Sequence, residues 1–167
     1  MSQSDSKEKK AVLGLFITIV GLLLIILITS LGYIRASRPM RQARAEAIEL
    51  ANQHVKLASV DQFYWFTREA TYFSLVGEDA KGQEIVVIIP KSGEEILIKK
   101  QEEGITEEEA KRIVRTEYPN ERIKKVTLGM YQEQIVWEVM TKVSEEEHYY
   151  LLAFSDGALI KSIPSIE

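Results

Sequence analysis

The chain has 167 residues, with 21 basic and 25 acidic side chains, two His and no Cys. This length allows one ordinary domain or two very small ones, and the lack of Cys excludes a disulfide scaffold, a thiol nucleophile and a Cys-based zinc site. Residues 45–167 hold 14 basic and 23 acidic side chains, a net charge of −9. Such a domain is a poor electrostatic partner for nucleic acid.

The segment Ala11–Ile34 contains no charged residue. As a helix it would cover roughly 36 Å, more than the hydrocarbon core of about 30 Å. Within lipid, every backbone polar group must be paired inside the segment, which requires a helix. The apolar run is too long for the core of a cleaved signal peptide. The sequence therefore predicts a retained transmembrane helix from Ala11 to Ile34, after a short segment of residues 1–10.

The charges that flank this segment do not orient it, because three Lys precede it and four Arg follow it. The lack of Cys weakly favours an extracytoplasmic domain. Gly14, Thr18 and Gly21 fall on one face of the predicted helix. Small residues allow another helix to approach closely in lipid, although glycine is also simply common in membrane spans.

After the span, a polar helix is predicted to begin at Arg38-Pro39 and to run to about Ala58. Four strand signals follow it, separated by turn residues; they cover residues 61–69, 71–77, 84–90 and 95–100. The run Ile85–Ile89 is apolar on both faces, which predicts a central strand covered on both sides.

The same pattern then starts again. Thr106 and Glu109 have the spacing of a capping box, so a helix is predicted from about Thr106 to Tyr118-Pro119. Four more strands are predicted, over residues 122–128, 134–142, 148–154 and 158–163. We interpret this as an internal repeat with an α+β fold, one helix with an antiparallel sheet in each half, because hairpins outnumber crossovers. Each half is small, so we expect the halves, residues 35–101 and 102–167, to pack together.

No motif of catalysis or phosphate binding is present, so no catalytic residue, cofactor site or metal site is predicted. His54 and His148 are interpreted as structural residues. A capped helix explains the acidic run 107–109, and a solvated hairpin loop explains the run 145–147.

The aromatic run Phe63–Phe66 would place aromatic side chains on both faces of one strand. If one face is core, the other is an exposed binding patch; the alternative is that both faces are covered. We take Tyr64 and Phe66 as candidate contacts with a partner protein, because aromatic residues concentrate at interface hot spots. Ala110 and Ile113 are predicted to lie on the buried stripe of the helix 106–118, and Trp137, in the middle of a strand, is expected to be buried against that helix near Ile113.

The second half resembles a PepSY domain. The matching residues are Thr106–Val114, Tyr118-Pro119, Ile123, Val126, Leu128, Trp137-Glu138-Val139, Tyr150–Phe154, and Asp156-Gly157 before Leu159-Ile160. The Asp and Gly are adjacent here, whereas PepSY domains usually keep a short spacer between them. The whole arrangement, with a basic N-terminus, one span, an Arg-Pro junction, an aromatic first module and a PepSY-like second module, resembles the YpmB/TseB-type family of Gram-positive bacteria.

This resemblance implies two tandem cystatin-like modules on the outer side of the cell membrane, with the N-terminus in the cytoplasm. It also implies a non-enzymatic regulator of cell-wall elongation whose partner is a membrane-bound penicillin-binding transpeptidase. An alternative is a module that controls a membrane or extracellular peptidase, since PepSY domains resemble peptidase propeptides. That alternative needs an exposed loop able to enter a cleft, and the candidate loops, 77–82 and 129–133, are short and polar.

Overall fold

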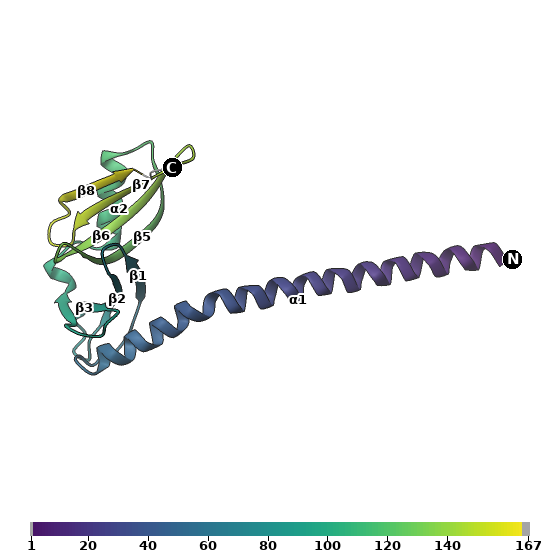
Figure 1. The fold of residues 1–167 in the computed structure, drawn as a ribbon, viewed down its shortest axis with the longest axis horizontal. Coiled ribbons are helices and arrows are strands. Elements are labelled where there is room, and N and C mark those ends of the chain that lie inside the picture. The colour runs from purple at the N-terminus through teal and green to yellow at the C-terminus, as the bar shows by residue number, and fades with distance from the viewer. Residues whose placement is uncertain (1, 165–167) are drawn as a thin grey trace. The chain divides into compact units, whose positions relative to one another are not determined.

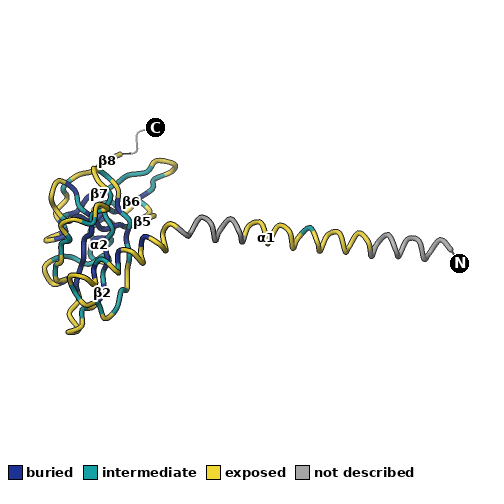
Figure 2. Tube along the Cα trace, turned by 60° about the horizontal axis from the view of Figure 1, so that its bottom comes forward, coloured by how far each residue is buried: buried dark blue, intermediate teal, exposed yellow. Residues whose placement is uncertain are grey.

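The computed structural model describes the backbone of residues 2–164 and the side chains of residues 13–29 and 39–164. The chain divides into two compact units, Met1–Gln42 and Ala43–Glu167. The first unit is formed by helix α1 (Ser2–Asn52), which continues into the second (Figure 1). The side chains described between residues 13 and 29 are almost all exposed, whereas the second unit has a buried interior (Figure 2).

Helix α1 corrects the predicted helix boundaries. No new helix begins at Arg38-Pro39, because α1 runs through Pro39 without a break. One proline removes a single backbone donor, and the residues on both sides are good helix formers in their own right. The helix also ends at Asn52 rather than near Ala58. The Leu57 N–H donates to Asn52 Oδ1 (3.0 Å) and the Ala58 N–H donates to the Glu78 carbonyl (2.8 Å), so these donors leave the helical pattern.

Sheet 1 is an antiparallel meander in the order β1-β2-β3-β4. Its strands are β1 (Gln62–Thr67), β2 (Thr71–Glu78), β3 (Glu84–Pro90) and β4 (Leu97–Lys100). Ala47 and Ala51, near the end of α1, pack against one face of the sheet. Strand β3 lies between β2 and β4, and residues 85–89 are all buried. The predicted central strand is confirmed.

Sheet 2 repeats this order as β5-β6-β7-β8. It follows a short 3-10 turn, η1 (Gln101–Glu103), and helix α2 (Glu107–Glu117); its strands are β5 (Arg122–Tyr131), β6 (Gln134–Val143), β7 (Glu146–Ala153) and β8 (Leu159–Pro164). Ala110 and Val114 of α2 pack on one face of this sheet. The α+β class and the two four-stranded antiparallel sheets are therefore confirmed.

Helix α2 begins as its sequence predicts. The Glu109 N–H donates to Thr106 Oγ1 (3.3 Å), and the Thr106 N–H donates to the Glu109 carboxylate (2.9 Å). These reciprocal bonds satisfy two backbone donors that a helix start leaves unpaired. The cap fixes where α2 starts, and its apolar stripe then falls on the core of the second module.

Candidate interaction surface

The two predicted partner contacts, Tyr64 and Phe66, are not on the surface. Tyr64 is 7% exposed and Phe66 is 1% exposed. The Tyr64 hydroxyl donates to the Glu107 carboxylate, and its ring meets the Trp137 ring edge-on at 5.4 Å. Burial, together with this hydrogen bond, raises the pKa of Tyr64. The expectation that this face of β1 is an exposed patch is wrong, because the second module covers it.

The edge of sheet 2 lies against this covered face of sheet 1. The Ser74 hydroxyl on β2 donates to the Leu128 carbonyl on β5 (2.7 Å), and a side chain at Gly129 would collide with the Phe66 ring. The Arg68 guanidinium forms an ion pair with Glu138 (2.5 Å). A sheet edge with unpaired backbone groups invites association with other strands, so this packing protects part of β5. The halves pack together, as expected from their size.

The opposite face of β1 carries Phe63 and Trp65, both half-buried. Phe73 joins them, stacked on Phe63 at 6.0 Å and edge-on to Trp65 at 5.1 Å between ring centroids. Phe63 and Phe73 pack against the core that the end of α1 covers. Both faces of the strand are therefore at least partly covered, which is the alternative left open by the sequence.

The residues predicted for the second core lie close together. Trp137 is 1% exposed, it packs with Ala110, and its Nε1 donates to the Ile105 carbonyl (2.8 Å). In the turn after β7, the Asp156 carboxylate accepts from the Ala158 N–H (3.0 Å). Gly157 has a φ of +76°, and a side chain there would collide with Ile113. These contacts explain why the chain has Asp-Gly at this turn.

Sheet 2 has a second face, which sequence reasoning did not single out. Residues alternate between faces along a strand, so Met140 and Tyr149, paired across β6 and β7, point away from Trp137 and α2. We call this surface the open face. Its half-buried centre is Met140, Tyr149 and Ile163, and its basic residues are Arg122, Lys125, Lys142 and Lys161. The alternation within the predicted strands could have revealed it.

A polar cluster lies on the α2 side of sheet 2. The Glu121 carboxylate accepts hydrogen bonds from the Thr141 hydroxyl and the Tyr150 hydroxyl (2.9 Å), and it lies 3.0 Å from His148 Nδ1. Burial acts to raise the pKa of Glu121, but these hydrogen bonds outweigh it and hold the pKa below its usual value. Because the Thr141 and Tyr150 hydroxyls both donate to the Glu121 carboxylate, we interpret the cluster as structural.

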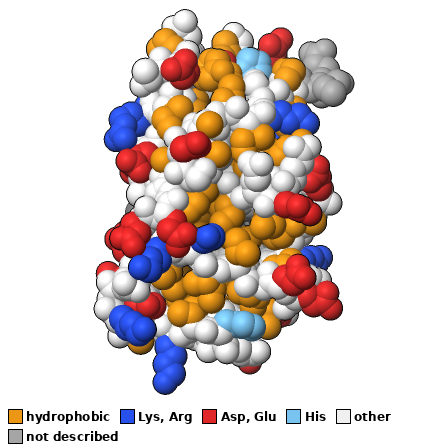
Figure 3. All heavy atoms as spheres, turned by 90° about the vertical axis from the view of Figure 1, so that its left-hand side faces the viewer, with side chains coloured by type: hydrophobic (Ala, Val, Ile, Leu, Met, Phe, Trp, Pro, Cys, Tyr) orange, Lys and Arg blue, Asp and Glu red, His pale blue; other side chains and the backbone are white. Residues whose placement is uncertain are grey.

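The unit Ala43–Glu167 contains several clefts. One of about 440 Å³ has Leu97, Ile135 and Phe154 in its lining, and another, of about 250 Å³, lies where Tyr64 and Trp137 meet Glu107. One side of the unit shows apolar side chains gathered between charged ones (Figure 3). Within residues 13–29 and 39–164, no three His, Asp or Glu side chains converge as a cation site.

The predicted span is only partly described. Among the residues whose side chains the structure describes, no helical stretch is both long and apolar enough to cross a membrane. Ala11 and Ile34, the predicted ends, lie outside those residues. Within them, the Thr18 hydroxyl donates to the Gly14 carbonyl (3.0 Å), and a side chain added at Gly14 or Gly21 would meet open space.

The fold is that of an α+β protein in which two modules, each with a four-stranded antiparallel sheet, share a core. The family model of the cell wall elongation regulator TseB-like domain matches residues 46–90. The chain is 30% identical over 159 residues to the "Probable cell wall elongation regulator TseB" of Bacillus subtilis (strain 168), covering 93% of this chain and 98% of that protein. The chain belongs to this TseB family of cell wall elongation regulators.

A solved structure agrees with this assignment. The YpmB protein from Bacillus subtilis superposes with a TM-score of 0.63 at 28% identity, over 72% of this chain and 96% of that chain. The shared region is long enough to include both sheets. The likeness of the second module to a PepSY domain remains a prediction.

Proposed function

We propose that this protein is a membrane-anchored, non-enzymatic regulator of cell-wall elongation that acts by contact with a membrane-bound penicillin-binding transpeptidase. The observation that carries the proposal is the similarity to the TseB protein, which extends over 93% of this chain. So broad an alignment must include most of the uncharged segment Ala11–Ile34 as well as the two modules.

The anchor is part of this proposal. A helix of Ala11–Ile34 would be long enough to cross a bilayer, and we place the modules on the outer side, where a regulator of cell-wall elongation would meet its partner, with the N-terminus in the cytoplasm. An anchor confines the protein to the layer in which its partner works, and confinement raises the effective concentration of a weak contact. A regulator of this kind needs no active site.

We place recognition in the modules rather than in the span. The face of Gly14, Thr18 and Gly21 is a common pattern in membrane helices, and contacts between small residues in lipid are weak and unselective. The folded unit offers a larger and more varied surface, with half-buried aromatic side chains and a charged rim. Tyr64 and Phe66 are excluded as its contacts because they are buried.

The test is crosslinking in living cells that express the full chain, followed by labelling of the recovered penicillin-binding proteins with a fluorescent penicillin. We expect one transpeptidase to be recovered, and to be recovered equally when Ala11–Ile34 is replaced by an unrelated span of equal length. A control protein with the native span and an unrelated outer domain should recover none.

Two results would count against the proposal. Recovery of no penicillin-binding protein above the control would remove the transpeptidase as partner. Recovery by the control protein, with loss in the span exchange, would move recognition into the membrane.

A further inference from the structure

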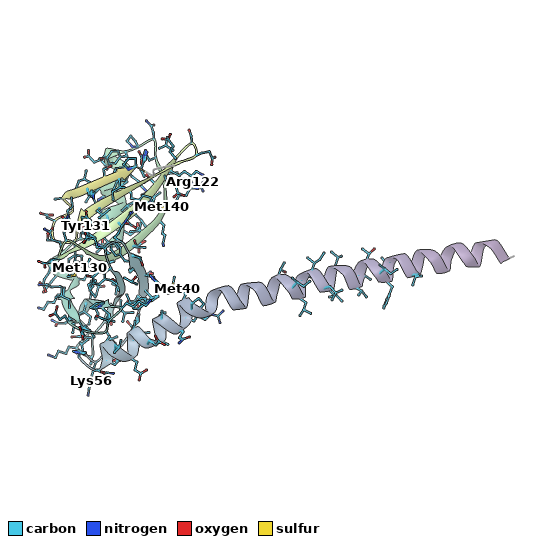
Figure 4. The ribbon with its side chains drawn as sticks, in the orientation of Figure 1. Met40, Lys56, Arg122, Met130, Tyr131 and Met140 are labelled. Carbon is cyan, nitrogen blue, oxygen red and sulfur yellow. The ribbon has the colours of Figure 1, made fainter. Side chains whose placement is uncertain are left out.

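The open face of sheet 2 combines an apolar centre with an excess of positive charge. Across the sheet, Lys125 pairs with Met140, Met140 with Tyr149, and Tyr149 with Ile163. Arg122 and Met140 lie toward one end of the sheet, and Tyr131 toward the other (Figure 4). Helix α2 packs on the opposite face, and the described part of α1 in this unit packs on sheet 1. Phe66 and Tyr72 of sheet 1 pack on part of the open face beside Val136 and Leu151, whereas Met140, Tyr149 and Ile163 stay half-buried.

The charges on this face are unequal. The open face carries five basic side chains, because Arg68 lies 4.5 Å above the Tyr149 ring and adds to the four already named. Its acidic side chains are Glu138 and Glu147. Arg68 and Glu138 neutralise one another, and the Lys142 ammonium pairs with Glu145 in the following turn (2.8 Å). Arg122 and Lys125 form no ion pair with any residue that the structure describes.

This excess of positive charge stands out because residues 45–167 have a net charge of −9. It also acts against stability: Arg122 and Lys142 are directly opposite each other on β5 and β6, and like charges in that position repel. Some of this positive charge protects the free end of the β5 edge, because lysine discourages the addition of another strand. A bulge has the same effect, and the register of β5 is irregular between Ile123 and Lys125. Edge protection does not explain Lys142, which is on a central strand, or Met140, which is half-buried and lies outside the apolar cluster of Phe66, Val136 and Leu151.

The composition identifies the kind of partner. Aromatic residues, Met and Arg are enriched at protein interfaces, with an apolar centre and a polar rim. A second copy docking through the same face would place cations against cations. A flexible anionic polymer or a lipid surface would meet the cations but would leave the apolar centre without a role. The surface best matched to this face is an acidic patch on another protein.

We propose that the open face docks an acidic surface of a partner protein, with Met140, Tyr149 and Ile163 at the centre and Arg122, Lys125 and Lys142 steering the approach. The inference deepens the proposed function, because it names the surface through which the regulator meets its transpeptidase.

The test places a photoreactive amino acid at position 140 of the full chain in living cells, and identifies each adduct by mass spectrometry. A matched variant carries it at position 112, an exposed site of α2 on the far side of the sheet. We expect an adduct with one protein at position 140 only, mapped to an Asp- and Glu-rich segment. Lys125→Glu with Lys142→Glu should lower its yield at least about tenfold, since like-charge contacts suppress association.

The control for the charge reversal is Arg112→Glu with Arg115→Glu, which changes the net charge equally on α2 and should leave the yield unchanged. Unaltered thermal unfolding of each variant confirms folding; if the reversal unfolds the domain, Lys125→Gln with Lys142→Gln replaces it. The inference is overturned if position 140 gives no protein adduct, if its adduct is lipid, polymer or a second copy, or if charge reversal has no effect.

These outcomes separate the two proposals. A transpeptidase adduct at position 112 alone would keep the proposed function and reject the open face as its surface. An acidic partner at position 140 that binds no penicillin would keep the docking face and reject the transpeptidase.

Discussion

Trp137 is the side chain on which the second core depends most. It is nearly fully buried, it contacts α2 and the ring of Tyr64, and its indole N–H has a partner in the Ile105 carbonyl. Trp137→Ala should therefore cost about 3–5 kcal/mol of unfolding free energy, measured by denaturant titration. Trp65→Ala, at a half-buried position, is the matched control and should cost less. Equal costs would contradict the assigned core.

Gly129 tests the packing between the two modules. A methyl group at this position would collide with the Phe66 ring, so Gly129→Ala should destabilise the protein by about 1–3 kcal/mol. With Phe66→Ala in the background, the same substitution should cost much less, because the obstacle has gone. The measurement is a double-mutant cycle of unfolding free energies. Additive costs would show that Gly129 and Phe66 are not in contact.

Glu121 links stability to acid pH. Its folded pKa lies below the usual value of 4.5, so its contribution to stability is fully present above that pH and is lost as the pH falls through the lowered pKa. Wild-type melting temperature should therefore fall more steeply below about pH 4.5 than that of Glu121→Gln. Glu146→Gln, at an exposed residue of β7, is the control and should follow the wild type. Parallel curves for all three proteins would reject this role.

At the scale of elements, the start of α2 gives a clean test. Thr106 accepts from the Glu109 N–H, so Thr106→Ala should cost about 1 kcal/mol, the usual value of an N-cap. Thr116→Ala removes a hydroxyl that bonds only the preceding turn of the same helix, and it should have little effect. The measurement is thermal unfolding of both variants. A larger loss for Thr116→Ala would mean that the capping box contributes little.

The strands could be predicted from the sequence because turn residues and hydrophobic alternation mark them locally. The end of α1 could not, because the Ala58 N–H, at the predicted end of the helix, donates to the Glu78 carbonyl, which is distant in the sequence. The environment of Tyr64 and Phe66 could not be predicted either, since β1 has aromatic side chains on both faces and alternation gives no preference. The burial of these two side chains depends on a contact with sheet 2, and no local sequence pattern predicts such a contact.

At the scale of the molecule, the two modules form one unit rather than two independent domains. Tyr64 and Val86 of the first module share a core with Trp137 and Val114 of the second. Modules of this size bury too little surface to be very stable alone. A partner would therefore meet a fixed platform, with Met140, Tyr149 and Ile163 of the open face half-buried at its surface and with Tyr64 and Phe66 of β1 buried inside it.

The proposed role of this protein depends on where this platform lies, and protease accessibility measures that directly. Protease added to intact protoplasts should remove the chain from about residue 35 onward, leaving the N-terminal segment in the membrane. A cytoplasmic protein measured in the same sample, and resistant until lysis, shows that the protoplasts are intact. Full protection of this protein, with digestion only after lysis, would contradict both the proposed outer location and the proposed role in cell-wall elongation.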